Sequence, residues 1–152
     1  MENRTSLVLN WPAVTSDYNL PLVAPTKILS FEIPQMTEIT IAALLAQHCR
    51  PRKGKDAGLS HHEVATCLEL LPEWHLSADS GEIRREFTFA DYFHTMAFVN
   101  AVASIAHRED HHPDLEVSYN RCLVRYSTHD VGGLSLNDFI CAARAEDLLV
   151  VA

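Results

Sequence analysis

Apolar residues recur with the spacing of one helix face over residues 60–71. The apolar positions in this stretch are Val64, Cys67, Leu68 and Leu71. The segment opens on Ser60-His61-His62-Glu63, which has the S-x-x-E form of a capping box, and it is closed by Pro72. The pattern therefore predicts a helix with one buried face.

Alternation of apolar and polar residues predicts strands further along the chain. Over residues 82–89 one side carries Ile83, Phe87 and Phe89, and the other carries Arg84, Glu86 and Thr88. Such alternation is typical of a half-buried strand. We expect a short strand at 74–76 to pair with it across a turn at 79–81. Two more strands are predicted by the alternating sets Leu115, Val117, Tyr119 and Cys122, Val124, Tyr126.

Two further helices are predicted, over residues 91–107 and from Ser135 to about Leu148. The first is apolar around most of its circumference, which favours burial on more than one side, against the sheet and against a partner subunit. Helices and strands in this order do not alternate singly. The order predicts an α+β fold, αββαββα, in which a four-stranded antiparallel sheet carries three helices on one face.

The folded body is expected to begin near Leu59. Four of the seven prolines lie within residues 1–35, where no useful helical or alternating pattern occurs. We interpret residues 1–35 as a flexible or loosely docked extension, residues 36–58 as a lead-in and loop, and residues 59–152 as the functional domain. Residues 50–58 are basic and poor in apolar side chains. A solvated loop is the favoured interpretation of this run, ahead of an anion site.

The charge balance excludes some partners. The 152 residues include 12 Lys and Arg against 20 Asp and Glu, which gives a formal net charge of −8. A nucleic-acid partner is not expected, because it would need a basic face. No run approaches the roughly 18 apolar residues of a membrane helix, and no secretory signal is visible at the start, so no membrane association is expected. Four cysteines without C-x-x-C spacing indicate free thiols and a cytoplasmic location.

Histidines gather in the second half of the chain. Five of the nine histidines lie there within one stretch, and imidazole titrates near neutral pH. Pro113 ends the preceding helix, which places His111 and His112 on a loop. A hairpin turn near Asn120 would bring one or both of them close to His129. Three imidazoles at one cleft, with carboxylates nearby, suit general acid–base chemistry.

Other interpretations stay open at this stage. Three histidines could hold zinc, although His107, which pairs with His111 at i, i+4, could instead complement the dipole at the helix end. The histidines could also be solvated surface residues. The S-x-x-D spacing from Ser135 to Asp138 predicts a helix cap that needs no further function. No G-x-S-x-G, Walker or G-x-G-x-x-G pattern supports a serine hydrolase or a nucleotide-binding protein.

A specific motif runs through three stretches, LPEWHL (71–76), IRREFTFADYFHTMAFVNAVA (83–103) and DHHPDLEVSYNRCLVRYSTHDVGGLSLNDF (110–139). It consists of H-H-P, an aromatic residue, T-H, G-G-L-S and D-F at fixed spacings. Over residues 59–147 the chain resembles the pterin-4a-carbinolamine dehydratase family in these features. The resemblance implies the αββαββα fold in a homodimer or homotetramer. It also implies loss of water from 4a-hydroxytetrahydropterin, a step that recycles the cofactor of aromatic amino acid hydroxylases.

The resemblance further assigns residues to the site. The implied catalytic residues are His111, His112 and His129, and the implied substrate-binding residues are Asp110, Thr128 and Asp138. We expect His112 and His129 to transfer protons and His111 to bind the substrate. Where family members often carry Glu, four positions before the histidine pair, this chain has His107. That departure leaves open which carboxylate serves the site.

The expected reaction needs neither a metal nor another cofactor. A proton must reach the leaving hydroxyl, and another must leave the adjacent ring N–H. Imidazole, with a pKa near 6.5, can do either at neutral pH. The alternative function is a non-catalytic coactivator or assembly factor on the same fold, for which the histidines would be dispensable. All three are present, which favours the enzyme.

Overall fold

The computed structural model describes residues 39–150, and its second helix is the one that the capping box predicts. Helix α2 runs over His61–Glu69. Glu63 N donates to Ser60 Oγ at 3.3 Å, and Ser60 N donates to the Glu63 carboxylate at 2.8 Å. Val64 and Cys67 are buried on one face of α2. The predicted helix is therefore confirmed, together with its start and its buried face.

Four strands form one antiparallel sheet in the order β1-β2-β4-β3. Their bounds are His75–Leu76 (β1), Ile83–Thr88 (β2), Asp114–Val117 (β3) and Arg121–Tyr126 (β4). β2 and β4 pair along their whole length, from Ile83 opposite Tyr126 to Thr88 opposite Arg121. On the inward face of these two strands, the half-buried Arg85 lies over the Phe87 ring. The inward apolar side chains are all buried: Ile83, Phe87, Cys122, Val124 and Tyr126. This burial confirms the alternation read from the sequence.

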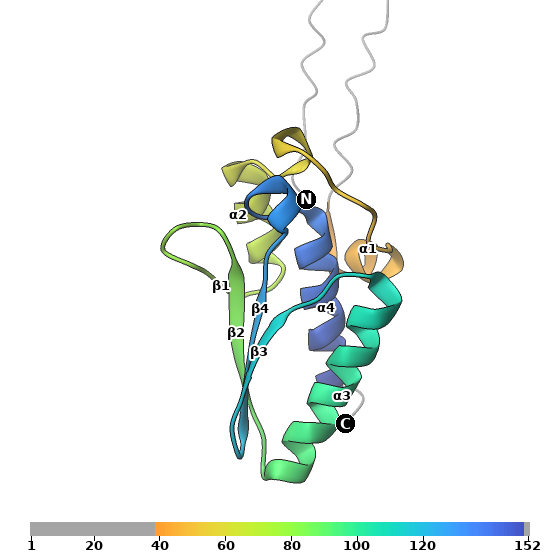
Figure 1. Ribbon diagram of the computed structural model, residues 1–152, viewed down its shortest axis with the longest axis vertical. Helices are drawn as coiled ribbons and strands as arrows, with labels where there is room; N and C mark the ends of the chain where they lie inside the picture. Colours follow the sequence, from red (N-terminus) through yellow and green to blue (C-terminus); the bar gives the residue numbers. More distant parts are fainter. Residues whose placement is uncertain (1–38, 151–152) are drawn as a thin grey trace, which may run out of the picture. The chain divides into compact units, whose positions relative to one another are not determined.

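Helices α3 (Tyr92–Glu109) and α4 (Leu136–Val150) lie on the same side of the sheet (Figure 1). Asp91 caps α3, because its carboxylate accepts a hydrogen bond from His94 N at 2.9 Å. The helix ends at Asp110, which adopts a left-handed conformation with φ 49°. The α+β class and the antiparallel sheet are confirmed.

Helix α3 packs into the core on one face, and its predicted contact with a partner subunit stays a prediction. The core face consists of Thr95, Phe98, Val102, Ile105, Ala106 and Glu109. Large apolar side chains at the start of α3 remain exposed: Phe93, on the opposite face, is 76% exposed, and Tyr92, which stacks on Tyr119, is 52% exposed. Within residues 39–150, no other element buries Phe93.

A fourth α-helix was not predicted. Helix α1 spans Ile41–Ala46, within the segment expected to be a lead-in and loop, and it packs against α4. Its Leu44 is fully buried in the main core. The sheet therefore belongs to a fold with four α-helices, and residues before Leu59 are part of its core. The division into domains stays a prediction, and the expected extension at 1–35 lies outside the described residues.

Candidate active site

The register of the β3–β4 hairpin brings distant histidines together. Asp114 of β3 pairs with Arg125 of β4, so the residues just before β3 lie beside those that follow β4. His111 and His112 precede β3, and His129 follows β4. All three line one cavity of about 470 Å³, a volume within the roughly 300–1,000 Å³ of small-molecule sites. The lining includes Glu109 at the end of α3 and Asn137 at the start of α4, and Figure 1 shows these two helix ends near the same end of the sheet.

His111 is buried and held in one orientation. Its backbone N–H donates to Ala106 O at 3.2 Å, which ties the loop to the end of α3. Its ring lies against Tyr126, with centroids 5.8 Å apart and an interplanar angle of 12°. Its Nε2 lies 2.7 Å from Asp138 Oδ1. These contacts leave the ring little freedom to turn.

Asp138 is fully buried and accepts hydrogen bonds on both oxygens. Oδ2 accepts from Thr128 Oγ1 at 2.8 Å and from Ser135 N at 2.7 Å. The contact with Ser135 is the helix-cap interaction that the S-x-x-D spacing predicts. Since an ionised carboxylate can only accept, the 2.7 Å contact makes His111 Nε2–H the donor and Oδ1 the acceptor. The neutral ring then carries its basic lone pair on Nδ1, so Asp138 sets the tautomer of His111.

His112 and His129 are exposed, in contrast to His111. His129 opens the short 3-10 helix η2 (His129–Val131) directly after Thr128. The turn that follows depends on Gly132, whose φ of 72° lies in the left-handed region, as expected from the paired glycines. Both imidazoles can therefore meet a ligand that enters the cavity from solvent.

The opposite wall of the cavity was not anticipated. It is formed by consecutive residues before the family-like region: Cys49, Arg50, Pro51, Arg52 and Lys53. Asn137, at the start of α4, fixes the backbone of this wall through two hydrogen bonds. Its Nδ2 donates to Arg50 O at 2.8 Å, and its Oδ1 accepts from Arg50 N at 3.2 Å. Further on, Gly54 N donates to Asp130 O at 3.1 Å. The basic composition of residues 50–58 was the only signal for this wall in the sequence, and residue spacing could not show that the run lies beside the histidines.

Two carboxylates next to the histidine pair, Glu109 and Asp110, line the cavity. His107, which stands where family members often carry Glu, is exposed and does not line it. The Glu109 side chain is 1% exposed. It accepts hydrogen bonds from Cys49 N at 3.0 Å and His48 Nδ1 at 3.1 Å, and Arg144 Nη2 lies 3.4 Å away. Burial alone would raise the pKa of Glu109, but these donors outweigh it and hold the pKa below its ordinary value.

Two further observations concern the described residues only. Within residues 39–150, no three His, Cys, Asp or Glu side chains are grouped so that they could hold a metal ion. Over the same range, no helix has both the length and the apolar character needed to cross a membrane.

A four-stranded antiparallel sheet backed by helices, with three histidines in one cavity, defines an α+β protein with a histidine-lined cavity. A family model described as pterin 4 alpha carbinolamine dehydratase matches residues 57–148. The chain therefore belongs to the pterin-4a-carbinolamine dehydratase family, a family of dehydratase enzymes, as its motif predicts.

Curated relatives and a solved structure agree with this assignment. A protein of Xanthomonas campestris pv. campestris (strain B100), assigned as a pterin-4-alpha-carbinolamine dehydratase, is 61% identical over 101 residues, covering 66% of this chain and 86% of the relative. One of Stenotrophomonas maltophilia with the same assignment is 59% identical over 105 residues, covering 68% and 90%. The crystal structure of a transcriptional coactivator/pterin dehydratase from Brucella melitensis matches with a TM-score of 0.58 and 28% identity, covering 60% of this chain and 97% of that one.

Proposed function

We propose that this chain removes water from 4a-hydroxytetrahydropterin to give quinonoid dihydropterin. The bond from ring carbon 4a to the hydroxyl oxygen breaks, a proton joins the leaving hydroxyl, and a proton leaves the adjacent ring N–H. The reaction involves no net oxidation. Family membership supports the activity, and the observation that carries the mechanism is that three imidazoles line one cavity.

His112 and His129 are the proposed proton-transfer groups. Both are exposed and line the cavity, so each can reach a bound substrate and exchange protons with water. Imidazole titrates near neutral pH, which suits one ring to donate and the other to accept. His111 is suited to binding, because Asp138 and Tyr126 fix its ring and leave Nδ1 as the acceptor.

The three proposed substrate-binding residues have different surroundings. Asp110 is exposed at the cavity and can accept hydrogen bonds from the N–H groups of a pterin ring. Thr128 lines the cavity, but its hydroxyl donates to Asp138. Asp138 is fully buried with both oxygens engaged. We therefore propose that Asp138 acts through His111 as a positioning residue, with Thr128 supporting it.

A stopped-flow assay on freshly generated 4a-hydroxytetrahydropterin tests the function. We expect His112→Ala and His129→Ala each to lower kcat roughly 10²–10⁴-fold, the usual contribution of a general acid or base. His107→Ala is the matched control, because His107 is exposed and outside the cavity. Wild-type rates in both of the first two variants, with the fold intact by circular dichroism, would defeat the assignment.

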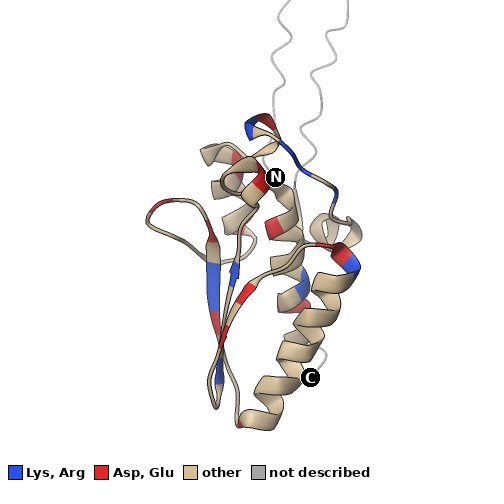
Figure 2. Cartoon of the chain, viewed as in Figure 1, with Lys and Arg blue, Asp and Glu red and all other residues tan. Residues whose placement is uncertain are grey.

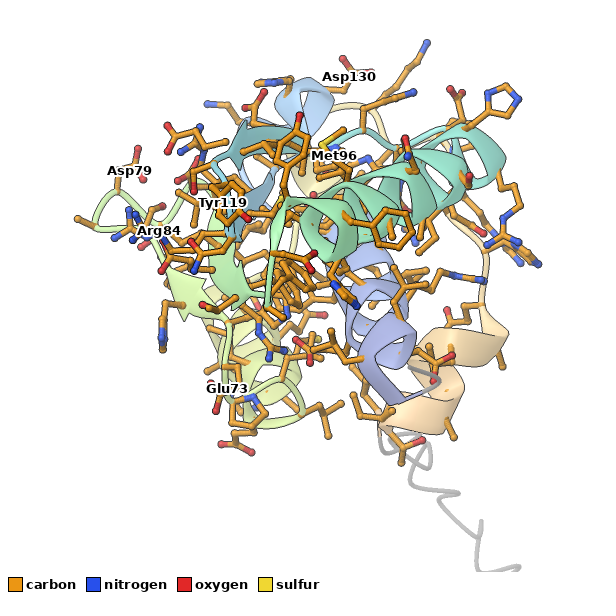
Figure 3. The ribbon with its side chains drawn as sticks, turned by 90° about the horizontal axis from the view of Figure 1, so that it is seen from below. Glu73, Asp79, Arg84, Met96, Tyr119 and Asp130 are labelled. Atoms are coloured by element: carbon orange, nitrogen blue, oxygen red, sulfur yellow. The ribbon has the colours of Figure 1, made fainter. Side chains whose placement is uncertain are left out.

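The physiological setting is part of the same proposal. We infer a role in recycling the pterin cofactor of aromatic amino acid hydroxylases, in the cytoplasm, where the four free cysteines would stay reduced. We also infer a homodimer or homotetramer, since Tyr92, Phe93, Val117 and Tyr119 leave apolar surface exposed on α3 and the β3–β4 hairpin. Met96 and Tyr119 mark this side of the molecule in Figure 3. Sedimentation velocity of the full-length chain measures the oligomeric state.

A non-catalytic coactivator or assembly factor is the second candidate. The structurally similar protein from Brucella melitensis is described both as a transcriptional coactivator and as a pterin dehydratase. The converging imidazoles favour the enzyme, because a protein-binding role does not need them. A tight complex with another protein, found in a preparation without dehydratase activity, would reverse this preference.

A further inference from the structure

We propose that the cavity selects a tetrahydropterin whose side chain carries a negative charge, as a phosphate ester or a carboxylate. This inference rests on the proposed function and names the substrate class for it. It starts from the wall formed by Arg50, Arg52 and Lys53, which we call the basic segment. These residues lie outside the part of the chain that the family model matches, 57–148.

Three cations on one side of a cavity are unexpected in a chain with a formal net charge of −8. Figure 2 shows several blue stretches, which mark Lys and Arg positions, along the loop that follows α1. Among residues 39–150, no carboxylate forms an ion pair with any of the three. Their charge is therefore available to a ligand.

Arg52 carries a second and independent signal. Its Nε is shielded from solvent, yet no group of the described residues accepts its hydrogen. Shielded donors in proteins are nearly always paired, so one without a partner beside a cavity calls for an explanation. An anionic group in the cavity would provide the acceptor, and guanidinium is the side chain best matched to phosphate and carboxylate.

The carboxylates of the same cavity do not cancel this wall. Glu109 is already neutralised by Arg144 and by donors from residues 48 and 49. Asp110 and Asp130, the latter labelled in Figure 3, also line the cavity, and among the described residues neither carboxylate forms an ion pair with the basic segment. The cavity thus combines imidazoles and carboxylates, which suit the N–H groups of the pterin ring, with three cations that suit an anionic substituent.

The basic segment is held in place before any ligand arrives. Its first residue exchanges two backbone hydrogen bonds with the side chain of Asn137, and Gly54, which follows it, donates to Asp130 O. A loop fixed at both ends loses little conformational freedom on binding, so its charges contribute more to affinity. A purely solvating basic loop would need neither of these anchors.

Turnover of three substrates tests the inference on the full-length protein. They are 4a-hydroxytetrahydropterins with a neutral hydroxylated side chain, with the phosphate ester of that side chain, and with a carboxylate-bearing side chain. We expect at least one charged substrate to exceed the neutral one about tenfold in kcat/KM, the ratio worth one charged hydrogen bond. The preference should weaken as salt rises, and the two charged arms identify the anion.

Variants connect the preference to Arg52. Arg52→Ala should lower the ratio of charged to neutral kcat/KM about tenfold, and Arg52→Lys, which keeps the charge, should retain more of it. Lys55→Ala is the matched control: it removes a cation from the same loop, at a position that does not line this cavity. An unchanged ratio in Arg52→Ala, with Lys55→Ala also unchanged, would overturn the assignment to this wall.

The inference and the proposed function fail in different ways. Equal turnover of all three substrates, or preference for the neutral one, overturns the inference and leaves the dehydratase intact. If no substrate is dehydrated, equilibrium dialysis with an oxidised pterin and its phosphate ester decides. Tighter binding of the ester, lost in Arg52→Ala, then supports a charged pterin ligand without catalysis, and equal binding overturns the inference as well.

Discussion

The two walls of the cavity are built in different ways. The histidine wall comes from residues 110–138, within the family-matched region, and buried hydrogen bonds that converge on Asp138 hold His111 and Thr128 in it. The basic segment comes from residues before that region and is fixed through its backbone by Asn137 and Asp130. One wall holds the groups suited to proton transfer, and the other holds the fixed charges.

This difference separates two tasks of an enzyme site. Acid–base chemistry needs imidazoles in a productive position, and the buried network fixes one of them, His111, while the proposed proton-transfer groups His112 and His129 lie exposed in the same wall. Selection of a charged substituent acts through electrostatics over a longer range and tolerates a mobile side chain on a fixed backbone. Changes in the two walls should therefore have separable effects on rate and on substrate preference.

The largest expected effect comes from a cavity-forming substitution in α1, the helix that precedes the basic segment. Leu44 of α1 is fully buried between α1 and the main core. Leu44→Ala should lower the free energy of unfolding by about 2–5 kcal/mol, as for other buried leucines. Chemical denaturation of the full-length chain measures it.

Leu149→Ala is the matched control for that change, because Leu149 is 39% exposed on α4. We expect a much smaller loss there. If Leu44→Ala lowered the free energy of unfolding no more than the control, α1 would not stabilise the fold. The basic segment, which follows α1, would then not be supported by a packed helix.

The sequence predicted the histidine wall for a physical reason. Its members lie on one hairpin and the flanking helix ends, where register and turn position follow from local alternation and from Pro113. Sequence spacing even identified Asp138 as a cap residue. It could not show that the cap carboxylate also holds His111, because that contact joins residues 27 positions apart.

The basic segment could not be placed from the sequence. Its anchors join residues 87 positions apart, between Arg50 and Asn137, and 61 positions apart, between His48 and Glu109. No periodic pattern encodes such contacts, and α1 is only six residues long, too short for a clear helical repeat. A short helix of this kind is stable only through tertiary packing, which a single sequence does not display.

The next effect tests the network of the histidine wall. Asp138→Asn replaces an acceptor of three hydrogen bonds by an amide with one acceptor oxygen, so the amide NH₂ must face either His111 or the donors Thr128 and Ser135. Facing His111, it would force the ring into the other tautomer. We expect kcat to fall by about 100-fold, the loss that follows from a misplaced group in a site.

The readout of Asp138→Asn must separate positioning from structure. The ring-nitrogen chemical shifts of His111 should report the changed tautomer, and the pH profile of kcat should change shape. Asp147→Asn, an exposed aspartate on the same helix, is the control. A lower rate without any change in the His111 shifts or in the pH profile would indicate a structural role alone.

The smallest expected effect concerns Glu109, the residue that connects the two walls. Glu109 ends α3 on the histidine side and binds His48 and Cys49 on the other. Glu109→Gln keeps an acceptor but removes the charge that Arg144 faces, so the free energy of unfolding at neutral pH should fall by roughly 1–3 kcal/mol. Glu69→Gln, at an exposed position on α2, should have almost no effect.

The pH dependence of that difference identifies the carboxylate as its source. The folded protein holds the pKa of Glu109 below its ordinary value, so its stabilisation is fully present above the unfolded pKa of about 4.3. The stabilisation is lost as pH falls through the lower, folded pKa, because the carboxyl must then take up a proton. The gap between wild type and Glu109→Gln should therefore close on acidification, measured by urea unfolding at a series of pH values. A gap that stayed constant with pH would show that shape, and not charge, joins the two walls.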